Sequence, residues 1–246
     1  MLYSLENVIK RRQREHGYRL LIRKLRIPRG ARIAITGPSG CGKSTTLDLL
    51  GLSLQPDEGD LFTFKPANKA PVDVLALWQA KAQDALAELR LRNMGYVLQS
   101  GELIPYLTVM ENMTLTARLC GRPYQEAKET AMAFGKELGI EPLFKAMPAT
   151  LSVGERQRVA IVRALASQPE LILADEPTAA LDPLHAARVM EIFLEAIART
   201  QSTLILVTHN VEWAMAGGLE ELPFVLQEDE KGVTAILDNS SQRGEP

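Results

Sequence analysis

The stretch GPSGCGKST, from Gly37 to Thr45, constrains the fold of this chain more than any other segment. Its glycines tolerate positive φ angles, and a run of backbone N–H groups can curl around an anion. The preceding residues Arg32–Thr36 are apolar and partly β-branched, as in a buried strand, whereas Thr45–Leu52 are compatible with a helix. A strand, a loop and a helix in this order place bound phosphates at the positive end of the helix. The segment therefore predicts an α/β nucleotide-binding fold.

The spacing within this phosphate loop assigns chemistry to single residues. Four residues separate Gly37 from the Gly42-Lys43 pair, which is typical of nucleoside triphosphate sites. The Lys43 ammonium can reach the β- and γ-phosphates, and the Ser44 hydroxyl can ligate Mg²⁺. We predict that the whole loop binds the phosphates of a nucleoside triphosphate through Gly37, Pro38, Ser39, Gly40, Cys41, Gly42, Lys43, Ser44 and Thr45. Kinases, GTPases and many motors share such a loop, so it does not give the function by itself.

A second group of polar residues follows two apolar runs. LILADEP (171–177) is typical of a buried strand that ends in Asp175 and Glu176, and TLILVTH (203–209) of another that leads to His209. In phosphoryl transfer one carboxylate holds Mg²⁺, often through water, and a second orients or deprotonates the attacking water. A surface Asp-Glu pair without a ligand is the alternative, but the end of a buried strand favours the catalytic interpretation.

The order of the motifs is more selective than any one of them. In chain order they are GPSGCGKST (37–45), YVLQ (96–99), LSVGERQRVAIVRAL (151–165), LILADEPT (171–178), AALD (179–182) and VTHN (207–210). Along most of residues 30–210 the series resembles the nucleotide-binding subunit of ABC transporters. ELRLRNMGYVLQ, LIPYLTVMENM and the signature segment (151–165) are similar to the branch with the lipoprotein-release (LolD), macrolide-export (MacB) and cell-division (FtsE) ATPases.

The resemblance implies roles for the matching residues. Ser44 and Gln99 would ligate Mg²⁺, and Asp175 would support that metal through water. Glu176 would act on the attacking water, and His209 would contact the γ-phosphate of ATP. The implied catalytic residues are Glu176, His209 and Lys43.

The resemblance also implies that two copies of the chain share each nucleotide. Ser152 and Gly154 lie at the start of a helix from about Val153, and a helix N-terminus attracts the γ-phosphate of ATP held by the second copy. Asp182 would communicate between the two sites. Two residues depart from the family pattern. Val153 occupies the position of the first signature glycine, and we expect its side chain to point away from phosphate. Glu155 replaces the common glutamine.

The resemblance further implies a P-loop NTPase core of the ABC type. It would comprise a mostly parallel sheet flanked by helices, an antiparallel β subdomain and an inserted helical subdomain. Residues 1–246 would form a single ATP-binding domain, with the core and β subdomain in 1–99 and 160–246 and the helical subdomain in 100–159. From the hydrophobic pattern we also expect a strand pair within 18–27 and one helix over 74–92.

Composition and charge limit the partners and the location that the sequence predicts. The 246 residues carry a formal charge of −2, which gives no overall attraction to nucleic acid. Residues 1–32 contain ten Lys or Arg against Glu6 and Glu15, which predicts either a solvated basic face or attraction to phosphates and acidic lipids. The two cysteines, Cys41 and Cys120, suggest neither a disulfide framework nor a metal cluster. No apolar run is long enough for a membrane span, and the N-terminus lacks the features of a signal peptide.

The favoured interpretation is a cytoplasmic ATPase subunit, peripheral on the inner face of the cell membrane. It would dimerise around two ATP and drive a separate inner-membrane permease for lipoprotein release, export or transmembrane signalling, with periplasmic accessory proteins acting through the permease. One alternative is a soluble ABC ATPase of the translation or DNA-repair type, which a single phosphate loop and the lack of a long coiled coil disfavour. Another is a degenerate regulatory partner, against which Lys43, Gln99 and Glu176 argue.

Two assignments stay open at this point. Arg12 stands where the family has an aromatic residue that stacks on adenine; a guanidinium plane can stack on a base, and Tyr18 or His16 are the alternatives. The apolar residues 103–107 follow Gln99 at once. They are either ordinary core or an exposed groove that receives a short helix of the permease.

Overall fold

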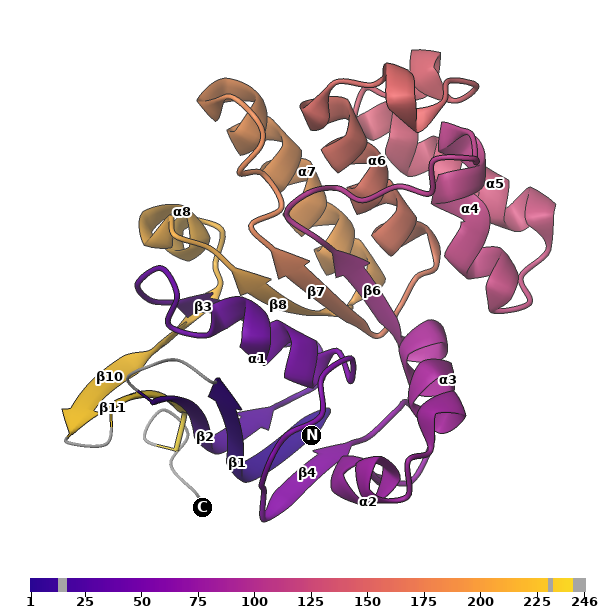
Figure 1. The fold of residues 1–246 in the computed structure, drawn as a ribbon. Coiled ribbons are helices and arrows are strands. Elements are labelled where there is room, and N and C mark those ends of the chain that lie inside the picture. The colour runs from indigo at the N-terminus through magenta and orange to yellow at the C-terminus, as the bar shows by residue number, and fades with distance from the viewer. Residues whose placement is uncertain (13–16, 230–231, 241–246) are drawn as a thin grey trace. The chain divides into compact units, whose positions relative to one another are not determined.

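The computed structural model describes residues 1–12, 17–229 and 232–240, without the side chains of Arg12, Trp213 and Asp229. The chain divides into two compact units (Figure 1). Unit 1 contains residues 1–89 and 205–246, and unit 2 contains residues 90–204. The predicted α/β class is confirmed, since strands and helices alternate along most of the chain.

Unit 1 is built on a six-stranded, mainly antiparallel sheet with the strand order β10-β11-β2-β1-β4-β5. The bounds are β1 Tyr3–Arg12, β2 Tyr18–Ile27, β4 Leu61–Phe64, β5 Val72–Asp73, β10 Val225–Asp229 and β11 Gly232–Asp238. One face of this sheet is apolar and buried, with the Tyr3 ring 5.0 Å from that of Phe64. The Tyr3 hydroxyl donates to the Leu50 carbonyl and thereby ties the sheet to the helix after the phosphate loop.

The expectation of a strand pair within residues 18–27 is wrong, because this segment is the single strand β2. Its partner is β1, which pairs with it in antiparallel register, Val8 opposite Ile22. The apolar alternation of β2 changes phase between Ile22 and Leu25, which gave the impression of two strands. The phase change in β2 faces Asn7, whose φ of 49° shifts the alternation of β1 in the same way. A local irregularity, rather than a turn, therefore explains the pattern.

The phosphate loop of unit 1 lies between a parallel strand and a helix, as predicted. β3 (Arg32–Thr36) pairs in parallel with β9 (Glu220–Pro223), and α1 (Lys43–Leu50) follows the loop. β8 (Thr203–Val207) ends in unit 1, where the Thr208 N–H donates to the Ile35 carbonyl at 3.4 Å. The short helix α8 (Val211–Ala216) connects β8 to β9.

Unit 2 combines a parallel strand pair with a group of helices. β6 (Met94–Val97) pairs in parallel with β7 (Leu171–Asp175), and β8 begins here, where the Thr203 N–H donates to the Glu170 carbonyl at 2.8 Å. Helix α6 packs against β6 and against α4, α5 and α7. The helix bounds are α4 Val109–Leu119, α5 Tyr124–Glu137, α6 Val153–Ala166 and α7 Pro183–Thr200, with short 3₁₀ turns at Glu141–Leu143 and Pro148–Thr150. Helix α6 is thus the central helix of unit 2.

The single helix expected over residues 74–92 is divided in two. α2 spans Val74–Gln79 and α3 spans Gln83–Asn93. Between them Lys81 adopts a φ of 53°, a left-handed conformation that no α-helix continues through. The high content of Ala, Leu, Lys and Glu hid this break, because none of these residues disfavours helix.

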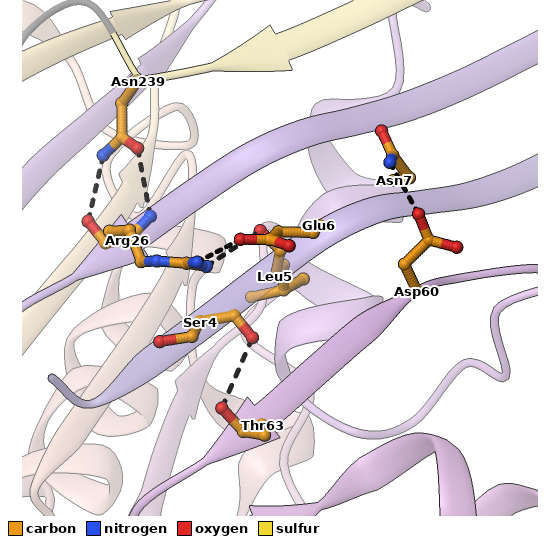
Figure 2. A network of polar contacts seen from close by, with 8 residues as sticks. All are labelled: Ser4, Leu5, Glu6, Asn7, Arg26, Asp60, Thr63 and Asn239. Atoms are coloured by element: carbon orange, nitrogen blue, oxygen red, sulfur yellow. Dashed lines mark hydrogen bonds and ion pairs between the residues drawn. The ribbon is translucent and has the colours of Figure 1, made fainter.

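Acidic residues of unit 1 balance much of the basic N-terminal region. Figure 2 shows the ion pair between Arg26 and Glu6, and Asn239 bonded to both backbone polar groups of Arg26 at 3.0 Å. Further ion pairs join this region to neighbouring strands and turns: Lys10–Asp57 at 2.9 Å, Arg11–Glu58 at 2.7 Å and Arg23–Asp238 at 3.8 Å. Exposed pairs of this kind add little stability, but they offset the local positive charge.

Among the helices that the structure describes, none has the length and apolar character needed to cross a membrane.

Candidate functional site

The phosphate loop has the backbone of an anion cradle. Gly37, Gly40 and Gly42 have φ angles of 152°, 78° and 100°, which side chains of L-residues rarely allow. A Cβ at Gly37 would lie 2.9 Å from Cys41 Sγ, and one at Gly42 would lie 3.2 Å from the Tyr18 hydroxyl. At Gly40 no atom lies within 4 Å of that position. The glycines are therefore required by conformation at all three positions and by close packing at Gly37 and Gly42.

Lys43 is held at the mouth of this cradle. Its Nζ donates to the carbonyls of Gly37 at 2.8 Å and Pro38 at 2.9 Å, and the side chain is buried. The neighbouring Ser44 is exposed, with its hydroxyl at the first turn of α1. A phosphate oxygen entering the loop would meet a lysine ammonium that the loop itself has already oriented.

Cys41 serves packing in this loop. Burial raises the pKa of its thiol, although the nearby Lys43 charge acts in the opposite direction. The side chain is 3% exposed and lies against Gly37. A protonated, buried thiol of this kind is a small apolar residue rather than a nucleophile.

The adenine platform is only partly described. The Arg12 side chain and His16 lie outside the described residues. Tyr18 directs its buried hydroxyl at the phosphate loop beside Gly42. The Tyr18 hydroxyl thus lies against the phosphate loop at Gly42, a contact that the sequence analysis missed.

His209 belongs to the same unit as the phosphate loop. It is exposed and lies two residues beyond the end of β8. The Thr208–Ile35 backbone bond joins the end of β8 to β3, the strand that leads into the phosphate loop.

Unit 2 carries the two predicted carboxylates at the end of β7. Asp175 is the last residue of that strand, and Glu176 follows with a φ of 45°. Both side chains are half-buried. A left-handed conformation is rare for glutamate, and such strained backbone is concentrated at functional sites. The turn is closed by the Ala179 N–H, which donates to the Glu176 carbonyl at 3.0 Å.

The start of α6 is held by a capping box that the sequence analysis did not identify. The Ser152 hydroxyl accepts from the Glu155 N–H at 3.2 Å, and the Glu155 carboxylate accepts from the Ser152 N–H at 2.7 Å. These bonds from Ser152 hold the pKa of Glu155 below its usual value. Serine followed three residues later by glutamate was the available signal. Glu155 therefore has a structural role of its own.

Val153 and Gly154, which also lie at the start of α6, have different surroundings. Val153 is 49% exposed at the first position of α6. Gly154 faces Leu181, because a Cβ at Gly154 would lie 2.7 Å from Leu181 Cδ2. The segment that contains Asp182 thus packs directly against the start of α6.

Asp182 itself is the N-cap of α7. It accepts from the His185 N–H at 3.2 Å, and its second oxygen lies 2.7 Å from His185 Nδ1. The backbone N–H of His185, and then its side chain, lower the pKa of Asp182. Aspartate is a preferred N-cap residue and proline is frequent at the first position of a helix, so Asp182-Pro183 was a readable signal for this cap.

Gln99 is exposed, and hydrogen bonds from helix side chains hold the backbone both before and after it. Gln157 of α6 donates from Nε2 to the Leu98 carbonyl at 3.1 Å. On the other side, buried Asn112 of α4 bonds both backbone groups of Ile104, with N–O distances of 2.8 and 3.1 Å. This leaves Ile104 and Tyr106 exposed, at 39% and 87%. Neither Gln157 nor Asn112 was singled out from the sequence.

Three predicted metal ligands are distributed over the two units. Ser44 lies in unit 1, whereas Gln99 and Asp175 lie in unit 2. Among the described residues, no cluster of three or more His, Cys, Asp or Glu side chains forms a metal site. Mg²⁺ in nucleotide sites binds a few protein oxygens together with waters and substrate phosphates, and each of these three residues carries an oxygen of that kind.

Known proteins match this chain over most of its length. The family "ABC transporter" matches residues 22–179. The lipoprotein-releasing system ATP-binding protein LolD of Legionella pneumophila (strain Lens) is 40% identical over 186 residues, which cover 76% of this chain and 78% of that protein. LolD of Aquifex aeolicus (strain VF5) is 41% identical over 190 residues, 77% and 80% of the two chains.

Solved structures give the same result. The ATP-binding cassette MJ0796, in a dimeric post-hydrolysis state bound to ADP and Pi, superposes with a TM-score of 0.75 and 30% identity. The match covers 90% of this chain and 93% of that one. Both the predicted resemblance and the predicted fold are therefore confirmed.

Proposed function

This chain belongs to the ABC transporter family, and on this premise we propose that two copies close around two ATP and thereby drive a separate membrane permease. The chain is an ATP-binding ABC-type ATPase with a role in transport. The observation that carries the proposal is the phosphate loop, in which three glycines of positive φ and the buried Lys43 form a ready anion site.

In the proposed reaction, water attacks the γ-phosphorus and the bond to the β,γ-bridging oxygen breaks. Glu176 accepts the proton of the attacking water, and Lys43 and His209 stabilise the charge on the γ-phosphate oxygens. Ser44 and Gln99 would hold Mg²⁺, with Asp175 bonded to one of its waters. The ion would neutralise the β- and γ-phosphates. The strained backbone at Glu176 supports a special orientation of this carboxylate.

The proposed dimer uses the start of α6. Ser152 and Gly154 would face ATP on the partner copy, while exposed Val153 would point beside the phosphate rather than at it. Asp182 would report the state of one site to the other, because its segment packs against Gly154 through Leu181. Loss of the γ-phosphate removes the charge that joins the copies, and the pair separates.

The proposed permease contact follows Gln99. Within residues 103–107, Ile104 and Tyr106 are exposed rather than part of the core, which supports a groove for a short helix of the permease. The chain would then lie on the cytoplasmic face of the cell membrane, and periplasmic proteins would act only through the permease.

We further propose the functional division into a core of residues 1–99 and 160–246 and a helical subdomain of residues 100–159. Contact density divides the chain at other points, between residues 89 and 90 and between 204 and 205. The division into two units follows packing. The proposed functional division follows the sequence motifs.

The decisive test compares wild type with Glu176→Gln. The variant is expected to bind ATP, to lose at least about 100-fold in turnover, as a lost general base costs, and to form a stable dimer in ATP. ATP turnover and light scattering measure the two effects. Full turnover by Glu176→Gln, or a monomer in ATP for both proteins, would refute the proposal.

A second test concerns the permease contact. Tyr106→Asp is expected to weaken co-purification with the membrane permease while ATP binding stays intact. Tyr124→Asp is the matched control, since Tyr124 is also exposed in unit 2 but lies on α5. Equal retention of the permease by both variants would exclude the proposed groove.

A further inference from the structure

The segment of residues 98–102 is called the Gln99 loop. Among the described residues, Gln157 is the one residue of α6 whose side chain forms a hydrogen bond with this loop. Its side chain is 1% exposed, and Nε2 donates to the Leu98 carbonyl at 3.1 Å. The same carbonyl accepts from the Gly101 N–H at 3.1 Å. The peptide group that precedes Gln99 is therefore fixed by two donors, one from the loop and one from the helix.

The oxygen of the Gln157 amide, Oε1, is buried and has no hydrogen-bond partner among the described residues. Buried side-chain oxygens almost always have a donor, so an exception calls for an explanation. Gln157 stands between the half-buried Arg156 and Arg158, and Val159, Ala160, Ile161 and Val162 after them are fully buried. Packing alone would have been served by an apolar residue.

The Gln99 loop lies directly against this oxygen. Gly101 has a φ of 57°, and a Cβ there would lie 2.7 Å from Gln157 Oε1 and 3.1 Å from Gln157 Cα. Only glycine fits this position, both by conformation and by space. The loop thus presents bare backbone to a side chain that offers a donor and an acceptor next to each other.

We propose that Gln157 is a positioning residue for Gln99, with Nε2 holding the Leu98 carbonyl in the present conformation and Oε1 accepting a loop N–H when Gln99 turns toward Mg²⁺ and phosphate. This inference rests on the proposed metal role of Gln99. A primary amide can exchange one bond for the other without leaving its buried position. The alternative, a purely structural tie, predicts an effect on stability alone.

The position of Gln157 in α6 would link the start of this helix to Gln99. Gln157 lies one helical turn after Val153, so it shares a face with the start of the helix. Farther along, burial lowers the pKa of the half-buried Arg163, and the charge of Glu102 in the same loop opposes this shift. Movement of the α6 start by a partner's ATP would reach the peptide group before Gln99 through the Gln157 side chain.

The experiment uses the full chain with Gln157→Leu, and Thr114→Val as the control. Thr114 is a buried polar residue of α4 in the same unit, bonded to the Met110 carbonyl at 2.9 Å and remote in sequence from the loop. Gln157→Leu is expected to raise the half-saturating Mg²⁺ concentration for ATP turnover about tenfold, as loss of a residue that orients a metal ligand does. It is also expected to speed hydrogen exchange of the 98–102 amides in protein without metal or nucleotide. Thr114→Val should do neither.

A second variant, Gln157→Glu, separates positioning from packing. An ionised carboxylate cannot donate to the Leu98 carbonyl, but a protonated one can, and burial favours protonation. The excess Mg²⁺ requirement of Gln157→Glu over wild type should therefore shrink as the pH is lowered from 8 to about 6. A requirement that is constant with pH would overturn the inference even if Gln157→Leu fails to fold.

Gln99→Ala distinguishes the two levels of failure. If Gln99→Ala raises the Mg²⁺ requirement while Gln157→Leu changes neither that requirement nor the exchange, the inference on Gln157 is wrong and the proposed function stands. If Gln99→Ala has no effect, the metal role of Gln99 is wrong and the inference falls with it.

Discussion

The phosphate loop and the start of α6 are both proposed to bind the same triphosphate, yet they are held in different ways. The loop is fixed by its own backbone, through glycines of positive φ and a lysine that bonds two loop carbonyls. The start of α6 is fixed by side chains, namely the Ser152–Glu155 capping box and Leu181 against Gly154. The first relies mainly on backbone conformation, and the second on a local side-chain cap together with a contact from the segment before α7. Substitutions should therefore act differently in the two regions.

The largest effect is expected for Gly42→Ala in the phosphate loop. The new Cβ combines strain at a φ of 100° with contact to the Tyr18 hydroxyl at 3.2 Å. We expect ATP to bind at least about tenfold more weakly, as strain of ~1–3 kcal/mol implies. A fluorescent ATP analogue measures the affinity.

Two other glycines serve as controls for Gly42→Ala. Gly40→Ala adds strain without a steric contact, and Gly30→Ala does so in a turn before β3. Gly40→Ala should weaken ATP binding less than Gly42→Ala, and Gly30→Ala should lower stability but leave affinity unchanged. Equal losses of affinity for all three would show that the loop is not fixed as described.

This difference between the two regions also explains what the sequence could predict. The loop, its flanking strand and helix, and the carboxylates after β7 were predicted from short windows, because local conformation and strand ends determine them. The capping box at Ser152 was readable in principle but was passed over. The Gln157–Leu98 bond was not readable, since these two residues are far apart in sequence and meet only when α6 packs beside the Gln99 loop. The Asn112 contacts with Ile104 are closer in sequence, but they depend on how the chain turns into α4, which no motif marks.

The two errors in the fold have different origins. Residues 74–92 have helical propensity throughout, and nothing in their composition marks the left-handed Lys81. Residues 18–27 seemed to hold two strands because the phase change at Arg23 is matched by Asn7 on the neighbouring strand. In residues 18–27 the pairing with β1, which a single window does not contain, accompanies the change of phase. At Lys81 the surrounding backbone bonds are local, and the structure gives no reason for the break that composition would reveal.

The next largest effect concerns the support of the loop by Tyr18. If Tyr18 contributes to nucleotide binding through Gly42 or by stacking, Tyr18→Ala should weaken ATP binding about tenfold, which is ~1.4 kcal/mol. Arg12→Ala is the companion variant. A loss confined to Arg12→Ala would assign the adenine contact to Arg12. Tyr18→Phe, which keeps the ring, would then separate the hydroxyl contact from stacking.

A smaller effect is expected for Gly154→Ala at the start of α6. The methyl group would meet Leu181 Cδ2, the mobile end of a side chain, so the neighbour can move. We expect ATP-driven dimer formation to fall only about threefold, as a contact worth less than ~1 kcal/mol implies, and the variant Leu181→Ala to restore it. Sedimentation in ATP measures the dimer. Failure of the rescue would mean that the partner's phosphate needs the bare backbone of Gly154.

The smallest effect is the acid sensitivity of the α7 cap. The bonds from His185 hold the pKa of Asp182 below its usual value, so the folded state prefers the ionised carboxylate. The stabilisation is complete above the pKa of the unfolded chain and is lost as the pH falls through the lower folded value. The difference in urea unfolding between wild type and Asp182→Ala should therefore be constant from neutral pH down to about pH 5 and shrink below about pH 4. A difference that does not change in acid would show that the Asp182 side chain caps α7 by accepting the His185 N–H without its charge.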